Sequence, residues 1–134
     1  MKSFACILAF CISSALIGQI DFSYCAMSKD KKAITILFCL EEGWESGYVS
    51  YASGNGIINI ESAGYELDFQ PEGRPGAFDY FFDECIDGVI TGRYSIYIQG
   101  ANIYSFRYEN YRNGQKFDFE ETHHDSFCHC QGLR

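Results

Sequence analysis

The C-terminal segment THHDSFCHCQGLR holds the side chains of this chain that are best suited to chemistry. All three histidines of the chain and two of its cysteines fall between His123 and Cys130. Zinc and copper accept imidazole and thiolate ligands, so one hypothesis is a metal site with the ligands His123, His124, Cys128, His129 and Cys130. The Cys-x-Cys spacing argues against it, because structural zinc sites draw on Cys-x-x-Cys or on pairs from separate segments. The preferred interpretation is that both cysteines form disulfides.

Catalytic groups are otherwise scarce. No serine or cysteine stands in a recognisable nucleophile motif, and no histidine lies outside the tail. Acidic pairs such as Asp83-Glu84 could serve glycoside hydrolysis, but neighbouring carboxylates on a strand point to opposite faces. The chain is therefore predicted not to be an enzyme and to need no cofactor.

The N-terminus has the pattern of a secretory signal. Lys2 precedes an uncharged apolar run, Phe4 to Ile20, which Asp21 ends. The run is a little short for a membrane span, which needs roughly 20 apolar residues, and is typical of a signal peptide. Cleavage after Cys25 or Ala26 is expected, with Gly18 as the alternative. This predicts a signal peptide over 1–25 and a single periplasmic or secreted β domain over 26–134, with no membrane contact after cleavage.

The cysteine count favours the later cleavage point. The chain has seven cysteines, and removal of 1–25 leaves four of them, Cys39, Cys85, Cys128 and Cys130. Cleavage after Gly18 would leave Cys25 as a fifth, unpaired thiol. Exported cysteines form disulfides by default, so Cys128 and Cys130 are expected to bond Cys39 and Cys85, in either order, and to fasten the tail to the sheet.

The charge of the chain limits its partners. Its net charge is −8, and removal of 1–25 leaves this value unchanged because Lys2 and Asp21 are lost together. Such a surface repels the phosphates of nucleic acids and anionic lipid. A basic protein is the partner that it favours.

The sequence after residue 33 reads as β structure throughout. Ile34 to Leu40 is continuously apolar, as in a strand buried on both faces, and Tyr65 to Gln70 alternates apolar with polar residues. About seven strands are expected, in an all-β, disulfide-stabilised, small antiparallel barrel or sandwich. The expected strands are 34–40, 48–52, 57–62, 65–70, 77–85 and a three-stranded meander over 94–119.

Two turns set the register of that meander. Asn113-Gly114 is typical of a two-residue hairpin turn, which would pair Tyr108 with Phe119 and Arg107 with Glu120. A three-residue loop, Gly100 to Asn102, would place six apolar side chains on one face. They are Tyr94, Ile96, Ile98, Tyr104, Phe106 and Tyr108.

The stretch SYASGNG, Ser50 to Gly56, resembles a loop of a known family. Ala52-Ser53-Gly54 is similar to the Ala-Ser-Gly loop with which MliC-like periplasmic inhibitors of c-type lysozyme plug the lysozyme cleft. These inhibitors are exported, disulfide-supported β-barrels, and the resemblance implies that Ser53 faces the catalytic carboxylates of the target. Exported immunity proteins that neutralise cell-wall-attacking toxins share this layout.

The functional prediction follows from charge, export and this loop. The chain is expected to be an exported binding protein that inhibits a basic peptidoglycan hydrolase, such as lysozyme, or a toxin effector. Trp44 lies among charges and glycines in EEGWESG and is expected to be exposed. The predicted partner-binding residues are Trp44, Tyr51, Ser53, Gly54 and Asn55. The alternatives are a metal-binding protein that uses the tail and a carbohydrate-binding module that uses exposed aromatic residues.

Overall fold

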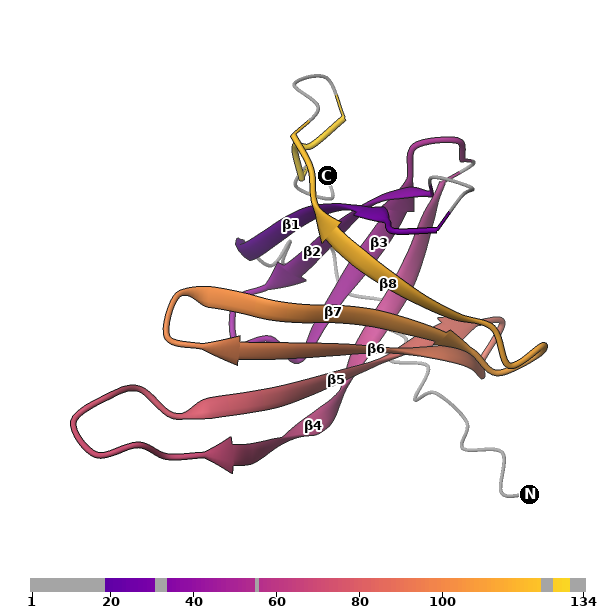
Figure 1. The fold of residues 1–134 in the computed structure, drawn as a ribbon. Helices are drawn as coiled ribbons and strands as arrows, with labels where there is room; N and C mark the ends of the chain where they lie inside the picture. The colour runs from indigo at the N-terminus through magenta and orange to yellow at the C-terminus, as the bar shows by residue number, and fades with distance from the viewer. Residues whose placement is uncertain (1–18, 31–33, 55, 124–126, 131–134) are drawn as a thin grey trace.

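The computed structural model describes residues 19–30, 34–54, 56–123 and 127–130. These residues form a closed antiparallel barrel in which each strand pairs with the next along the chain and the last pairs with the first (Figure 1). The all-β class is confirmed; of the two predicted architectures, barrel or sandwich, the chain adopts the barrel, with eight strands in place of about seven. The strands are β1 (Ile20–Ser28), β2 (Thr35–Glu41), β3 (Ser46–Tyr51), β4 (Ile57–Phe69), β5 (Ala77–Ile86), β6 (Val89–Gln99), β7 (Asn102–Asn110) and β8 (Lys116–Glu121).

The strand that the sequence analysis did not anticipate is β1. It pairs with β2 along its length, from Ile20 opposite Glu41 to Met27 opposite Thr35, and with the end of β8. Most of it falls within the predicted signal peptide, because cleavage was expected after Cys25 or Ala26 and the apolar run before it ends only at Asp21. Cleavage after Cys25 would remove most of β1, whereas cleavage after Gly18 would keep it whole. The leader proper lies outside the described residues and stays a prediction.

Aromatic rings fill the middle of the barrel. Phe38 of β2 lies at the centre, with its ring centroid 5.5 Å from Phe82, 5.4 Å from Tyr94 and 5.1 Å from Phe106. These rings face inward because alternate residues of each strand point to the same side. The interior is thus a packed core, as is common in barrels of this size.

The prediction that β2 is buried on both faces is confirmed, and the C-terminal tail is the reason. Ile36, Phe38 and Leu40 face the interior, while Leu37 and Cys39 face outward into a second, smaller apolar cluster. The tail covers this outer face of the barrel. Its side chains in the cluster are Phe127, Cys128 and Cys130.

Two disulfides hold the tail there. Cys128 is bonded to Cys25 of β1 and Cys130 to Cys39 of β2. The expected role of the tail as a fastener is therefore confirmed, but the expected pairing is wrong for Cys128, which was assigned to Cys39 or Cys85. Cys25 is not a stranded thiol, since the antiparallel register of β1 and β2 brings it close to the tail. Cys85 is also disulfide-bonded.

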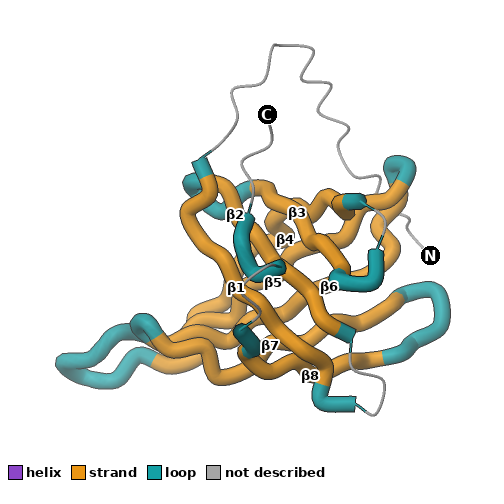
Figure 2. The backbone as a smooth tube through the Cα atoms, turned by 90° about the horizontal axis from the view of Figure 1, so that it is seen from above, coloured by secondary structure: helices purple, strands orange, loops and turns teal. Residues whose placement is uncertain are grey.

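The β4–β5 hairpin is much longer than its neighbours and extends past the barrel (Figure 1, lower left; Figure 2, far left). The sequence analysis divided β4 at Ala63-Gly64, but the chain continues as one strand through a β-bulge between Ser62 and Gly64. Gly64 adopts a φ of 102°, a conformation that glycine adopts most readily. Every residue from Ser62 to Phe69 is exposed.

The two predicted turns of the meander differ from the structure. Gln99 pairs with Asn102, so the β6–β7 turn has two residues, and a register shift between Tyr97 and Ile98 then brings Ile103 opposite Ile98. Tyr104 consequently lies on the outer side and is exposed. The bulge, rather than a three-residue loop, thus places Ile98, Phe106 and Tyr108 on the same face of the sheet.

The β7–β8 register is shifted by two residues from the predicted one. Tyr108 pairs with Phe117, and Arg107 pairs with Asp118 rather than Glu120. The turn is longer than Asn113-Gly114, because the Asn110 amide donates to the Gln115 carbonyl. A shift by two keeps every side chain on its face, so aromatic residues still meet aromatic residues and opposite charges still meet.

Among the described residues, no helix is long and apolar enough to cross a membrane.

Candidate functional site

Successive hairpin loops of an up-and-down barrel lie at alternate ends, which separates two of the predicted site residues. Trp44 lies in the β2–β3 turn and Ser53 in the β3–β4 loop. Strand β3 runs between them for six residues, or about 20 Å. The predicted set therefore does not form one surface, because Trp44 and Ser53 lie at opposite ends of the barrel.

Trp44 is held in place rather than fully exposed. Its ring lies 4.9 Å from Phe22 and 5.1 Å from Tyr80 between centroids, and its Nε1 donates to Asp21 Oδ2 at 2.8 Å. Its backbone has a φ of 59°, an uncommon conformation for a residue other than glycine, asparagine or aspartate. Trp44 thus covers one end of the barrel, where the interior rings reach the surface.

The aromatic side chains continue outward from Tyr80 along the β4–β5 hairpin. The exposed fractions are 66% for Tyr65, 53% for Leu67 and 57% for Phe69. The Tyr65 ring lies 5.7 Å from Tyr80 and 5.9 Å from Phe78. Tyr65 and Leu67 lie opposite Tyr80 and Phe78 on the hairpin side that continues the barrel interior, and Phe69 follows beyond a register shift, opposite Ala77. We call Tyr65, Leu67, Phe69, Phe78 and Tyr80 the aromatic face.

The opposite side of the same hairpin is acidic. Glu66 pairs with Asp79 across the strands, and Asp68 lies two residues from Glu66 on the same side. Partial burial, followed by the charges of Asp68 and Glu66, raises the pKa of Asp79. The Tyr97 hydroxyl donates to Asp68 Oδ2 at 2.9 Å. We call Glu66, Asp68 and Asp79 the acidic face.

The Ser53 loop lies at the other end of the barrel and is exposed. Ala52, Ser53 and Gly54 all face solvent, and the Gly54 amide donates to the Tyr51 carbonyl at 2.9 Å. Asn55, also predicted to bind a partner, lies outside the described residues. This hydrogen bond ties the described part of the loop to the end of β3.

Tyr51 does not belong to the exposed part of this loop. Its hydroxyl lies 3.2 Å from that of Tyr94 inside the barrel, and burial raises its pKa. We also expected Tyr51 to lie off the core face, and this position is wrong, since Tyr51 packs against the core; its role in partner binding stays a prediction. Sequence alternation within the short strand β3 could not fix its side, because residues on both faces of that strand are apolar.

Sequence reasoning missed a buried carboxylate at this end. Glu84 is only 4% exposed, and its Oε1 accepts hydrogen bonds from Thr91 Oγ1 at 2.7 Å and from the Tyr108 hydroxyl at 2.8 Å. Proximity to Glu84, after burial, raises the pKa of Tyr108. The alternation of Phe78, Tyr80 and Phe82 could have shown that position 84 faces inward.

The buried position of Glu84 suits structure better than catalysis. A substrate would have to displace packed rings to reach it. Its neighbour Asp83 faces outward and pairs with Arg93, with 2.8 Å between Oδ1 and Nε. The pair Asp83-Glu84, considered above for glycoside hydrolysis, thus points to opposite faces of β5, as expected.

A hollow on the outer side of β5–β8 holds mixed charges. Arg93 pairs there with Asp83, and Arg107 pairs with Asp118 at 2.8 Å. Each guanidinium of the hollow thus already has a carboxylate partner. Its lining residues are Asp79, Arg93, Ser95, Ser105, Arg107, Tyr108, Glu109 and Lys116.

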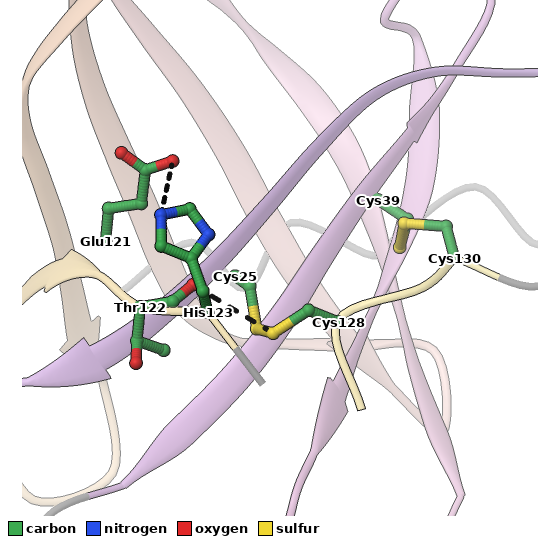
Figure 3. The surroundings of a disulfide bond; sticks show 7 residues. All are labelled: Cys25, Cys39, Glu121, Thr122, His123, Cys128 and Cys130. Atoms are coloured by element: carbon green, nitrogen blue, oxygen red, sulfur yellow. Dashed lines mark hydrogen bonds and ion pairs between the residues drawn. A yellow bond between two sulfur atoms is a disulfide. The ribbon is translucent and has the colours of Figure 1, made fainter. Parts of the chain in front are cut away.

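The tail does not have the form of a metal site in the part that is described. Both of its cysteines are in disulfides, which removes the thiolates from the predicted ligand set (Figure 3). His123 lies beside Glu121, with 3.9 Å between Nε2 and Oε1. His124 lies outside the described residues, which contain no group of three or more metal-binding side chains.

The chain matches no protein-family model, no curated protein sequence and no solved structure.

Proposed function

We propose that this chain is an exported binding protein that neutralises a basic partner protein through the end of the barrel that carries Trp44 and the β4–β5 hairpin. The observation that carries the proposal is the exposure of Tyr65, Leu67 and Phe69 side by side. Contiguous exposed apolar side chains mark interaction sites in soluble proteins. Aromatic residues are enriched in such sites.

The charge of the chain supports a basic partner. The net charge is −8, and the acidic face lies directly behind the aromatic face on the same two strands. Charge of one sign steers an oppositely charged partner toward the surface and raises the rate of association. Anionic lipid and nucleic acid would instead require a basic protein surface.

The packed rings of the barrel interior favour a binding surface on the outside of the barrel. Phe38, Phe82, Tyr94 and Phe106 pack against one another at its centre. Carrier barrels of similar size hold a ligand in this space. A partner of this chain would instead be contacted from outside.

The target class comes from the resemblance noted in the sequence. A peptidoglycan hydrolase such as a c-type lysozyme, or a toxin effector of similar charge, is the proposed partner. The loop that resembles the inhibitory loop, Ala52–Gly54, is exposed at the other end of the barrel. It is the alternative contact surface, with Ser53 directed at the target's catalytic carboxylates.

The test is an inhibition assay with the full chain, purified after export so that its disulfides form. The chain is titrated into a c-type lysozyme and other basic hydrolases acting on peptidoglycan. We expect activity to fall as the chain reaches the enzyme concentration, and inhibition to weaken at high salt. If no hydrolase is slowed and no basic protein is bound, the proposal is wrong.

Surface variants then identify the contact. Tyr65→Ser with Phe69→Ser should weaken inhibition by about tenfold or more, the size of effect typical of aromatic anchors. The matched control is Tyr104→Ser with Tyr111→Ser, which removes two exposed rings, 63% and 47% exposed, from outside the aromatic face. If Ser53→Ala abolishes inhibition and the Tyr65 variant does not, the loop is the contact.

Carbohydrate binding is the second candidate, because exposed rings such as Tyr65 and Phe69 can stack on sugars. Trp44, the only tryptophan of the chain, packs against Tyr80 of the aromatic face. A change in its fluorescence with soluble peptidoglycan fragments, in the absence of any protein, would favour this candidate.

A further inference from the structure

The projecting part of β4 has an outer edge that no described strand covers. Pairing of β4 with β3 ends where Glu61 meets Ser46, and the Ser62 amide donates to the Glu45 carbonyl at 2.8 Å. Beyond that point β4 continues to Phe69 with β5 as its only partner among the described strands. Figure 1 shows this half of the hairpin standing clear of the barrel. An uncovered edge is a template for pairing with another strand.

The two faces of this edge differ sharply in chemistry. Tyr65 and Leu67 lie on one face and Glu66 lies on the other; a register shift between Leu67 and Phe69 ends this regular alternation, and Asp68 lies on the acidic side beside Tyr97. Side chains directly opposite one another on paired strands interact. A strand that suits this edge would therefore alternate apolar residues with lysine or arginine.

A second copy of this chain does not suit the edge. Two antiparallel copies centred on Glu66 would set Tyr65 against Leu67, which is favourable, but also Glu66 against Glu66. Like charges that face each other across strands are destabilising. Each copy also carries a net charge of −8. Charged edge residues are a common protection against self-pairing.

We propose that the edge of β4 from Ala63 to Phe69 binds an extended segment of a basic partner protein, in which apolar and basic residues alternate. The added strand would hydrogen-bond to β4 through its backbone, as in other cases of strand addition. Its apolar side chains would extend the aromatic face, and its lysine or arginine side chains would meet Glu66 and Asp68. This inference rests on the proposed function, whose partner it describes more closely.

Three synthetic peptides test the backbone contribution. The first is acetyl-Lys-Val-Lys-Val-Lys-Val-Lys-amide, the second has the same residues in two blocks, and the third has the alternating order with a methyl group on every backbone nitrogen. Binding of labelled peptides to the full chain is followed by fluorescence anisotropy. We expect the alternating peptide to bind about tenfold more tightly than the other two, because only it supplies both the pattern and the donors.

Hydrogen exchange locates the bound peptide. With the alternating peptide, the amides of Tyr65 to Phe69 should exchange more slowly, and those of Ala52 to Gly54 should not change. If the three peptides bind within about twofold of one another, or if protection appears at the Ser53 loop, the inference is wrong.

A charge reversal provides the matched variant. Glu66→Lys with Asp68→Lys should reduce binding of the alternating peptide about tenfold, as expected when opposite charges become like charges. Glu42→Lys with Glu120→Lys makes the same change in net charge at exposed positions outside this edge and should have a smaller effect. Equal effects of the two double variants would show attraction by net charge alone and overturn the inference.

The outcomes separate this inference from the proposed function. A chain that binds the alternating peptide along β4 but slows no hydrolase retains the inference and loses the proposed target. If the chain inhibits a hydrolase but binds all three peptides alike, the proposed function stands and the inference of strand pairing at the β4 edge is wrong.

Discussion

The core of the barrel has a different composition at its two ends. At the Ser53 end the interior contains polar groups, with Glu84 bonded to Thr91 and Tyr108, and Tyr51 close to Tyr94. At the Trp44 end the rings of the interior continue onto the projecting hairpin, where Tyr65 is two-thirds exposed.

This difference indicates where stability and binding are each concentrated. A buried hydrogen-bonded carboxylate favours one arrangement of the side chains around it, whereas exposed rings contribute little to folding. The Ser53 end is therefore expected to be sensitive to substitution in stability, and the Trp44 end in binding. The predictions below test that division.

The largest predicted effect is a difference in unfolding free energy between alanine variants of two aromatic residues in one hairpin. Phe82 and Tyr65 lie on the same face, but Phe82 is buried in the barrel and Tyr65 is exposed. Phe82→Ala should lower the free energy of unfolding by about 3–5 kcal/mol, and Tyr65→Ala by less than about 0.5 kcal/mol. Urea denaturation measures both. A large loss for Tyr65→Ala would show that the aromatic face is already packed within the chain.

Tyr108→Phe should have the next largest effect, because it removes one of the two hydrogen bonds to Glu84. A loss of about 1.5–3 kcal/mol at pH 7 is expected for a hydrogen bond to a charged group. Urea denaturation of this variant measures the loss, and Tyr104→Phe, which removes an exposed hydroxyl, is the control.

The same tyrosines predict the alkaline limit of stability. Burial raises the pKa of Tyr94 and Tyr108 in the folded state. Their neutral forms therefore stabilise the fold fully below the unfolded pKa of about 10, and this contribution is lost as the pH rises above it. Thermal unfolding should shift to lower temperature between about pH 10 and pH 11. The Tyr108→Phe variant should show a smaller shift, and an equal shift would contradict the assignment.

Trp44 fluorescence should report which end a partner contacts. Its ring lies between Phe22 and Tyr80 at the hairpin end, so a partner bound there should remove water from it and move its emission by a few nanometres to shorter wavelength. A partner bound at Ser53 should leave the emission unchanged. An unchanged spectrum with a tightly bound basic protein would assign binding to the Ser53 end.

Asp79→Asn should have the smallest effect. Because the pKa of Asp79 is raised in the folded state, its charged form disfavours the fold at neutral pH, and this effect disappears as the pH falls through the folded pKa. The variant should therefore be more stable at pH 7 by no more than about 0.5 kcal/mol, with the gain lost in acid. Urea denaturation at both pH values measures it, and Glu120→Gln, at an exposed position, is the control.

The sequence predicted the class of fold and the arrangement of faces, but not the registers. The apolar run from Ile34 to Leu40 identified a doubly covered strand. Bulges such as the one between Ser62 and Gly64 change a register by one residue and leave no clear pattern in the sequence. Registers must therefore be settled by packing across strands.

The site was only partly predictable for a related reason. The exposure of the Ser53 loop and the opposite orientation of Asp83 and Glu84 were predicted from local pattern, but not which of the two carboxylates is buried. The aromatic face was missed because Tyr65, Leu67 and Phe69 alternate like residues of a core strand, and only the length of the hairpin shows that no core lies beneath them. Cys25 was assigned to the leader because cleavage after it would leave an even number of cysteines, and no local pattern reveals its bond to Cys128, 103 residues away.

The path of the tail has a mechanical consequence. The seam between β1 and β8 joins only three residue pairs, yet the chain leaves β8, crosses this seam and is bonded to β1 and then to β2. A pulling force that peels β8 from β1 would soon load covalent bonds instead of hydrogen bonds. The first and last strands of the barrel therefore stay covalently linked through the tail until a reductant breaks the two disulfides.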